Sequence, residues 1–431
     1  MPDPFRHYEG VPVIDLPADP PSPDVAAWDV LRGRLGPLTA LNGPALLSRL
    51  LFYSAAISAS KLAPATGYRY ALRVNPSSGN LHPTEFHFAT RGLAGWPDGI
   101  YHYRPSQHMA ERRGSGDFGF DGTLVFVLTT IAWREAWKYR DRAYRYCLHD
   151  IGHAWQALEL AARAMGFTCS AVGSFDDAEL TKRLGLAHDE WPMLVMTLHG
   201  EAAHGALDRE FLGGVPNVLS DDSKVSDLIQ RMHAATCGLG VEWIVDRPVA
   251  DVPAVGGRGF GEVVRTRRSA LDFAGGERDM TMAQLLAVLS VARAPLLILY
   301  LYVHRVAGLP AGLYRYAGEL ELLRTGDQRV AAAGLSLGQD LAGNACIAIS
   351  MIADLDGAVS RYGDRGYRYA HFEAGALGHR LYIAAEALGL GATGIGAFFD
   401  DRVHSYLDVE RGQVIYHFAI GYPIPDPRLE A

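Results

Sequence analysis

The stretch 362-YGDRGYRYAHFEAGALGHRLYIAAEALGLGATGIGAFFD-400 has a second copy earlier in the chain. Residues 139–177 align with it without a gap, at an offset of 223 positions. From residues 138 and 361 onward, 14 of 38 aligned positions are identical. A further block recurs at an offset of 213, with 97-PDGIYHY-103 matching 310-PAGLYRY-316. The chain of 431 residues is therefore a tandem duplication.

Each copy predicts an α+β unit. In the repeated block, small and apolar residues recur at helical spacing, and the predicted helix of the second copy ends at Gly389. Abundant Ala and Gly permit close approach of another helix, so we expect the two long helices to pack centrally. A short strand and a turn, "GSFDD" or "GAFFDD", follow and open another helix.

The repeats also suggest domain boundaries. We predict an N-terminal extension over residues 1–35, a first unit over 36–203, a connector over 204–258 and a second unit over 259–431. Each unit closes on an apolar strand, 192-PMLVMTLHG-200 or 413-QVIYHFAIG-421, and 294-APLLILYLYV-303 predicts a buried strand too short to cross a bilayer. In the connector, 223-SKVSDLIQRMHAA-235 predicts a helix.

Composition excludes several classes of protein. Apolar residues make up 49% and charged residues 20%, as in ordinary globular proteins, and the net charge of −8 argues against a nucleic-acid partner. The four cysteines lack CxxC spacing, which argues against a zinc site or a disulfide framework. The N-terminus does not resemble a signal peptide. We expect a cytoplasmic protein with no membrane segment and no metal site.

Turn chemistry is concentrated in 73-RVNPSSGNLHPTE-85, and the second copy has no equivalent stretch. Proline fixes the entry to a loop, and glycine lets backbone pass close to a ligand. Ser and Asn side chains can hydrogen-bond a planar carbonyl-bearing ring or a phosphate. The alternative interpretation is a strand-to-helix turn with a serine N-cap. These residues alone leave both interpretations open.

Two other stretches carry candidate chemistry. In 265-RTRRSALDF-273, adjacent arginines and a serine could clamp a phosphate, although a solvated basic turn has the same composition. In 137-WKYRDRAYRY-146, Lys138 and Tyr139 are neighbouring proton-transfer groups. A lysine becomes a base near neutral pH when it is desolvated, whereas a surface lysine beside a core tyrosine would have no such role.

Together, PSSGN, RRS, the KYxxRxYRY block and the G-x-G-x-F-x-D turn resemble the nitroreductase superfamily of FMN-dependent oxidoreductases. The block at 361–401 is particularly similar to SagB-type peptide dehydrogenases, which oxidise azolines to azoles in ribosomal peptide natural products. The resemblance covers most of residues 60–200 and 260–425. The resemblance implies antiparallel sheets flanked by helices, in two units that form an intramolecular pseudo-dimer. It also implies an enzyme that transfers hydride to FMN, with a dimer-like interface as the place of the cofactor.

The resemblance also implies how the site residues divide between the copies. In the family, one subunit supplies Arg-Arg-Ser and the glycine turn, and the other supplies the PSSxN loop. Here the first unit has PSSGN but reads 51-LFYSAAIS-58 where RRS is expected, and the second has RRS but reads 289-LSVAR-293 where PSSGN is expected. One FMN per chain follows as a hypothesis. Its candidate ligands are Pro76, Ser77, Ser78, Asn80, Arg267, Arg268, Ser269, Gly394 and Gly396, with Arg428 as a C-terminal phosphate ligand.

Catalysis is assigned by the same resemblance to Lys138 and Tyr139, since the second copy has Arg361 in place of the lysine and arginine is a poor base. The substrate would be a small molecule or peptide, with other biosynthetic enzymes as partners. An NAD(P)H-dependent nitro or flavin reductase and a flavin-poor scaffold subunit are the alternatives. The protein is expected to be a monomeric pseudo-dimer or a homodimer.

Overall fold

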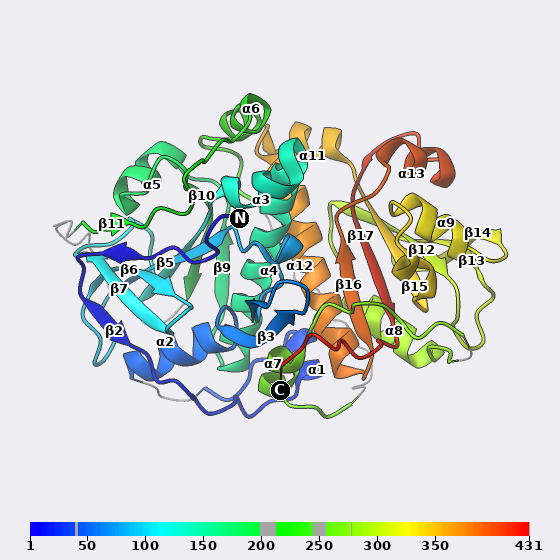
Figure 1. The fold of residues 1–431 in the computed structure, drawn as a ribbon, viewed down its shortest axis with the longest axis horizontal. Coiled ribbons are helices and arrows are strands. Elements are labelled where there is room, and N and C mark those ends of the chain that lie inside the picture. Colours follow the sequence, from blue (N-terminus) through cyan, green and yellow to red (C-terminus); the bar gives the residue numbers. More distant parts are fainter. Residues whose placement is uncertain (39–41, 199–212, 244, 246–255, 277, 431) are drawn as a thin grey trace.

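The computed structural model describes residues 1–38, 42–198, 213–243, 245, 256–276 and 278–430. Two antiparallel sheets lie on either side of a central pair of helices (Figure 1). The sheet orders are β2-β7-β6-β5-β8-β10-β9 and β14-β13-β12-β15-β17-β16, which match strand for strand once β2 is left out. The predicted α+β class is therefore confirmed.

The strands of the first sheet are β2 (Val13–Asp15), β5 (Thr84–Thr90), β6 (Gly99–Arg104), β7 (Met109–Gly114), β8 (Leu124–Thr130), β9 (Cys169–Val172) and β10 (Trp191–Leu198). Those of the second are β12 (Leu297–Val303), β13 (Gly312–Tyr316), β14 (Leu320–Thr325), β15 (Ile347–Ala353), β16 (Gly391–Ile395) and β17 (Gln413–Gly421). The three strands predicted from apolar runs are thus β10, β12 and β17. Each sheet packs its apolar side chains against one of the two central helices.

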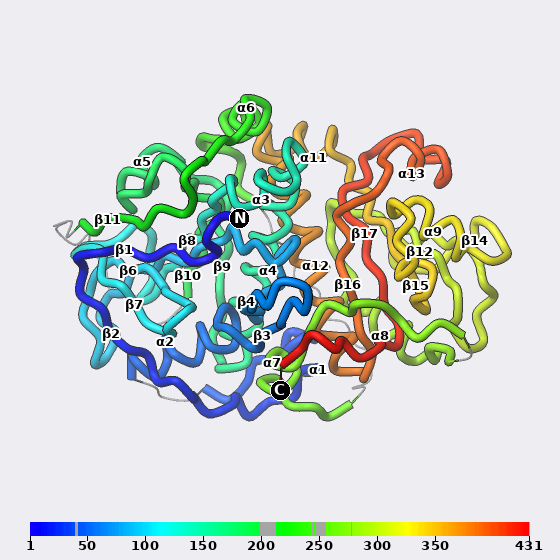
Figure 2. The backbone as a smooth tube through the Cα atoms, in the orientation of Figure 1, coloured from blue at the N-terminus to red at the C-terminus, as the bar shows by residue number. Residues whose placement is uncertain are grey.

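The central helices are α4 (Ala143–Ala164) and α12 (Gly366–Ala387), one from each copy. They approach so closely that a Cβ atom on Gly152 would collide with the backbone oxygen of Phe372, and one on Gly375 with that of His149. Gly152 and Gly375 are 223 positions apart in the sequence, and so are His149 and Phe372, so the crossing point lies on a pseudo-twofold axis. The prediction of a central helix pair is confirmed (Figure 2).

The other helices of the described residues are α1 (Ala27–Leu31), α2 (Gly43–Phe52), α3 (Ala132–Tyr139), α5 (Asp177–Leu184), α6 (Asp227–Ala235), α7 (Phe260–Thr266), α8 (Met282–Ser290), α9 (Arg329–Leu335), α10 (Asp340–Asn344), α11 (Leu355–Tyr362) and α13 (Asp400–Leu407). The "GSFDD" turn opens α5, where the Asp176 side chain accepts a hydrogen bond from the Glu179 amide at 3.0 Å. In the described part of the chain, no helix is both long and apolar enough to cross a membrane.

The N-terminal segment and the connector join the first unit through short strands. β2 adds an edge strand to the first sheet, and β1 (Tyr8–Glu9) pairs with β11 (Val215–Pro216) of the connector. The hairpin β3 (Ile57–Ala63) and β4 (Tyr68–Arg73) bridges to the C-terminal tail at Lys61 and Leu429. The predicted boundary between residues 203 and 204 lies outside the described residues, and the domain limits remain predictions.

Near the start of each copy, the residues that correspond in space are not those that the constant offset of 213 positions pairs. α1 and α7 begin side by side: Ala27 N donates to Arg258 O at 3.0 Å, and Phe260 N donates to Val25 O at 2.9 Å. Residues 34–36, directly after α1, are therefore the counterparts of Arg-Arg-Ser. The prediction that placed them within 51–58 is wrong, because the β3–β4 hairpin lengthens the first copy at this point.

Candidate functional site

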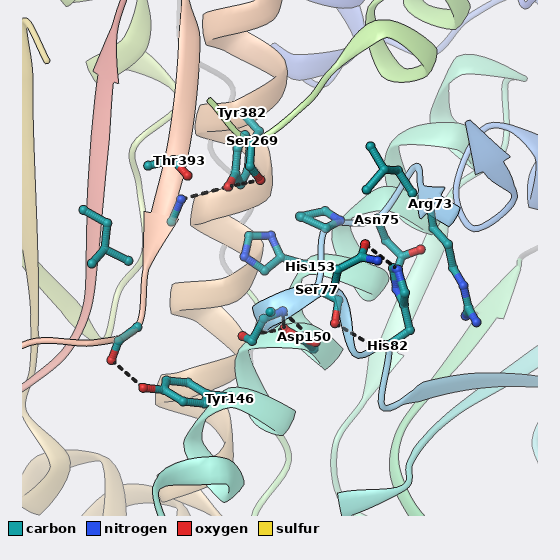
Figure 3. A pocket seen from close by; sticks show the side chains of 18 of the residues that line it. Arg73, Asn75, Ser77, His82, Tyr146, Asp150, His153, Ser269, Tyr382 and Thr393 are labelled. Carbon is teal, nitrogen blue, oxygen red and sulfur yellow. Dashed lines mark hydrogen bonds between the residues drawn. The ribbon is translucent and has the colours of Figure 1, made fainter. Parts of the chain in front are cut away.

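A cavity of about 330 Å³ lies where the two units meet, beside α4 and α12 (Figure 3). Both copies line it: the first contributes the PSSGN loop and α4, and the second contributes the RRS segment, β16 and β17. The site residues predicted from the two copies are therefore brought together across the pseudo-dimer interface. Those that line this cavity are Pro76, Ser77, Ser78, Asn80, Tyr139, Arg267, Arg268, Ser269, Gly394 and Gly396.

The PSSGN loop is held rigidly by hydrogen bonds of its own. Residues Ser78–Asn80 form a short 3₁₀ turn in which Gly79 and Asn80 both have φ of 59°. Ser77 does not cap this turn with its side chain; its Oγ accepts a hydrogen bond from the His82 amide at 2.8 Å. Asn80 Nδ2 donates to Ala71 O at 3.0 Å. The simple N-cap interpretation of the serine is therefore not observed.

Asp150 of α4 holds the PSSGN loop through hydrogen bonds to Ser78. This residue was not among the site residues predicted from the sequence. Its Oδ1 accepts hydrogen bonds from the amide and the hydroxyl of Ser78, both at 3.1 Å. Burial raises the pKa of Asp150 to about 7, against the lowering effect of the hydrogen bonds from Ser77 and Ser78. Its counterpart in the repeat, Glu373, is also acidic, and that pairing was the signal in the sequence that could have found it.

Arg267 places a cation in the cavity wall. It is 3% exposed, its Nη2 lies 3.4 Å from Arg73 O, and its Nε and Nη1 have no hydrogen-bond partner among the described residues. Burial lowers the pKa of Arg267, but an arginine remains charged at neutral pH. A buried guanidinium with free donors fits an anionic group such as a phosphate.

Arg268 and Ser269 complete the RRS segment in different ways. Arg268 donates to the backbone oxygens of Arg267 at 2.7 Å and Ser58 at 3.0 Å, so part of its hydrogen-bonding capacity serves the local fold. Ser269 Oγ lies 2.8 Å from Tyr382 Oη, which accepts a hydrogen bond from the Gly394 amide at 2.8 Å. This relay ties the RRS segment to β16 (Figure 3).

Two glycines, Gly394 in β16 and Gly396 directly after it, allow aromatic rings to approach the backbone. A Cβ atom on Gly394 would collide with the Tyr416 hydroxyl, and one on Gly396 with the ring of Tyr146. The Tyr146 hydroxyl donates to Gly396 O at 2.9 Å. These glycines therefore have a packing role, and their bare backbone also faces the cavity, as a close contact with a planar ligand requires.

Lys138 and Tyr139 lie at the edge of the site. Tyr139 lines the cavity, and a Cβ atom on Gly79 would come within 2.5 Å of its hydroxyl and 3.0 Å of Lys138 Nζ. Lys138 is exposed, so the desolvation considered from the sequence is not observed. It lines a neighbouring cavity of about 420 Å³ that shares Gly79 and Asn80 with the first. Burial raises the pKa of Tyr139, with Glu135 and Tyr146 adding to the effect.

Arg428 also lines the neighbouring cavity rather than the main one. Its guanidinium pairs with Asp426 at 2.7 Å, and Asp426 also contacts Lys61 Nζ at 2.8 Å. Its backbone oxygen accepts a hydrogen bond from Leu62 N at 2.9 Å, which holds the C-terminal tail on β3. Residues of the main cavity that the sequence analysis did not name include Arg73, Asn75, His82, Asp150, His153, Tyr382 and Tyr416.

A protein-family model, described as the nitroreductase family, matches residues 55–200 and 283–422, one match in each copy. The chain belongs to the nitroreductase family. The two matches coincide with the two sheet-containing units, so the duplication is a duplication of the nitroreductase fold. The chain is a duplicated member of this family, whose members are generally flavin oxidoreductases.

Known relatives agree with this membership. A solved structure of a nitroreductase-type protein from Anabaena variabilis is 28% identical, with a TM-score of 0.79 over 98% of this chain and 94% of that one. The Methanocaldococcus jannaschii protein MJ1384, named as a nitroreductase, is 33% identical over 115 residues, which are 26% of this chain. The chain matches 58% of the length of that curated relative. The E. coli microcin synthetase McbBCD complex is 22% identical over 36% of this chain and 62% of that one, with a TM-score of 0.30, a likeness of fold alone.

Proposed function

We propose that this nitroreductase-family chain binds one FMN in the cavity between its two units and uses it to oxidise or reduce a small-molecule or peptide substrate. The observation that carries the proposal is the buried guanidinium of Arg267, which borders a cavity completed by the PSSGN loop of the other copy and has two donors with no hydrogen-bond partner among the described residues. A phosphate-bearing planar cofactor matches both features of this cavity.

The residues divide the work of binding. Arg267 and Arg268 would hold the phosphate with charge-assisted hydrogen bonds. The PSSGN loop and the bare backbone at Gly394 and Gly396 would contact the ring from opposite units. When bound, FMN supplies a hydride acceptor or donor, while the protein positions the substrate and excludes water.

The finer proposal is a dehydrogenase of azoline type. Such a reaction removes a proton from the carbon next to the one that loses hydride, so a base must border the ring. Tyr139 stays protonated at neutral pH, because its burial raises its pKa above that of an ordinary tyrosine. Tyr139 therefore suits a hydrogen-bond donor, and Lys138 is the candidate base. Because Lys138 is exposed, it would serve as a base only once the bound substrate shields it from water. We place the protein in the cytoplasm, with other biosynthetic enzymes as partners.

A visible spectrum of the purified protein, followed by anaerobic addition of NADPH, tests these proposals. A flavin spectrum that NADPH does not bleach supports the dehydrogenase. Rapid bleaching favours the NAD(P)H-dependent nitro or flavin reductase, and the Anabaena variabilis and Methanocaldococcus jannaschii relatives are both named as nitroreductases. A colourless protein that does not take up added FMN contradicts the flavin proposal and favours a scaffold role.

A further inference from the structure

The repeat places a twin of the cofactor cavity on the other side of the pseudo-twofold axis. Tyr369 and Glu373 of α12 are the counterparts of Tyr146 and Asp150 of α4, at the offset of 223. Both tyrosines pack on a glycine at the end of a strand: a Cβ atom on Gly173 would come within 2.5 Å of the Tyr369 ring, just as Gly396 meets Tyr146. The twin positions are therefore built alike.

The two carboxyl groups are also used alike. Asp150 accepts a hydrogen bond from the backbone amide of Ser78 at 3.1 Å, and Glu373 accepts one from the backbone amide of Leu296 at 2.9 Å. Leu296 therefore stands where the PSSGN loop stands in the first copy. Residues 289–293, which the constant offset matched to that loop, end α8 and form the turn after it. In the second copy, a shorter loop between α8 and β12 supplies the backbone amide that donates to Glu373.

A side chain of the connector fills the twin position. Trp243 is 4% exposed, and its ring stacks on Tyr369 with centroids 4.8 Å apart and an interplanar angle of 2°. Its indole Nε1 donates a hydrogen bond to Glu373 Oε1 at 3.3 Å. The edge of the ring meets Trp155 at 5.0 Å. The indole of Trp243, a planar ring with one N–H, thus lies on Tyr369 and directs its N–H to the carboxyl group of Glu373.

The first site is open at the same place. Among the described residues no aromatic ring stacks parallel on Tyr146, and Tyr139 meets it edge-on at 4.5 Å and 76°. The 330 Å³ cavity reaches both Tyr146 and Asp150 (Figure 3). Asp150 Oδ1 accepts hydrogen bonds from the amide and the hydroxyl of Ser78, Oδ2 lies 3.2 Å from the same amide, and Ser77 adds a further hydrogen bond. A carboxylate has about four acceptor positions in total. Asp150 can therefore accept a further donor from the cavity.

We propose that Trp243 is a built-in substitute for a cofactor ring in the lost second site, and that Asp150 accepts a ring N–H of the cofactor in the first. The proposal rests on the proposed function, because it takes the ligand to be FMN. The oxidised flavin ring carries its one N–H at N3. Asp150 is then a direct contact of the cofactor ring as well as a support of the PSSGN loop.

The test compares the dissociation constants of FMN and 3-methyl-FMN, which lacks the N–H, for the wild type and Asp150→Ala. At a pH well above the value of about 7 to which burial raises the pKa of Asp150, we expect the wild type to bind the methylated ring about tenfold more weakly, as the loss of one charge-assisted hydrogen bond predicts. Asp150→Ala should bind the two ligands equally, and Asp150→Asn, which keeps the shape of the side chain, should show an intermediate ratio. Glu373→Ala, at the twin position, should keep the wild-type ratio.

The outcomes separate the two proposals. Equal weakening of both ligands by Asp150→Ala would show that Asp150 only supports the loop, and it would overturn the inference while FMN binding stands. A wild type that does not distinguish the two ligands would overturn it as well, whether or not the variants fold. A wild type that binds neither ligand overturns the proposed function and the inference with it.

Discussion

At the residue scale, the site depends on a few charged side chains whose surroundings differ sharply. Arg267 is buried with two free donors, whereas Lys138 is exposed beside Tyr139. Both were named from short motifs, and the sequence could not distinguish their environments, because burial depends on what other segments pack against them. Arg267 is covered by the other copy, through the backbone of Arg73. Lys138 is at the end of α3, with solvent on one side.

Replacing Arg267 with Ala should weaken FMN binding about a hundredfold, or about 2.7 kcal/mol, because it removes a desolvated charge from the phosphate. Fluorescence titration of FMN measures the change. Arg265→Ala is the matched control, since Arg265 lies over the Phe52 ring at 4.0 Å and is not among the residues that line the cavity. An unchanged dissociation constant for Arg267→Ala would remove this residue from the phosphate site.

Replacing Lys138 with Ala should lower turnover of the substrate about a hundredfold or more, the usual contribution of a general base. Bound FMN should remain, because Lys138 does not line the main cavity. Stopped-flow reduction of the flavin by substrate separates the two effects. Lys224→Ala, at a side chain that is 84% exposed, is the control. Reduction at the wild-type rate would exclude Lys138 as the base.

At the scale of elements, the crossing of α4 and α12 sets the distance between the two halves of the site. Each helix carries one side of the interface, and glycines at the crossing let the backbones touch. The sequence indicated this contact, because Ala and Gly recur on the predicted helices. Which loop residues of one copy match those of the other was harder to predict, since insertions such as the β3–β4 hairpin change the sequence offset between the copies. Contacts between the two copies, such as that of α1 with α7, show which residues match.

Replacing Gly375 with Ala should destabilise the fold by roughly 2–4 kcal/mol, because the new Cβ would overlap the backbone oxygen of His149 and force the helices apart. Denaturant unfolding measures the loss. Gly334→Ala in α9 is the matched control: a Cβ there meets no atom within 4 Å, so helix propensity should stabilise that variant by up to about 1 kcal/mol. Similar effects of the two substitutions would contradict the close crossing.

The protonation of Glu373 should make the free energy of unfolding depend on pH. Burial raises its pKa to about 7, against hydrogen bonds from Leu296 and Trp243 that lower it, and its ordinary value is 4.5. The folded state therefore binds more protons than the unfolded state between these values, so this group lowers the free energy of unfolding as pH rises from 4.5 to 7. Glu373→Gln should remove about 1–3 kcal/mol of that decline.

Unfolding curves of the apoprotein at pH 4.5, 5.5, 6.5 and 7.5 measure the effect, as the difference between the wild type and Glu373→Gln. The control is Glu319→Gln, at an exposed carboxyl. A difference for Glu373→Gln that does not vary with pH would mean that this carboxyl binds protons equally in the folded and unfolded states, and it would contradict the raised pKa.

At the scale of the whole molecule, fusion of two nitroreductase units has left two unequal interfacial positions. One holds an open cavity lined by both motifs, and the other is filled by Trp243. The counterparts of Arg-Arg-Ser in the first copy include Arg34, which is 62% exposed and pairs with Asp29. Arg34 is therefore engaged by a carboxylate, whereas the guanidinium of Arg267 has two donors without a hydrogen-bond partner among the described residues.

We expect one FMN per chain. Acid extraction of the holoprotein followed by absorbance and protein quantification gives the ratio directly. A monomer that carries one flavin would show that a single chain assembles the whole site. Two flavins per chain would require Trp243 to leave its place on Tyr369, and they would contradict the single-site proposal.

The sequence by itself determined the duplication, the α+β class, the central helix pair and the division of the PSSGN and RRS motifs between the copies. These features follow from local sequence patterns, which can be recognised without knowing how distant segments pack. Only the tertiary structure revealed the carboxyl of Asp150 beneath the loop, the exposure of Lys138 and the indole in the twin position. The burial and the partners of these three side chains come from residues far away in the sequence. Tertiary packing decides which distant segment lies against each of them.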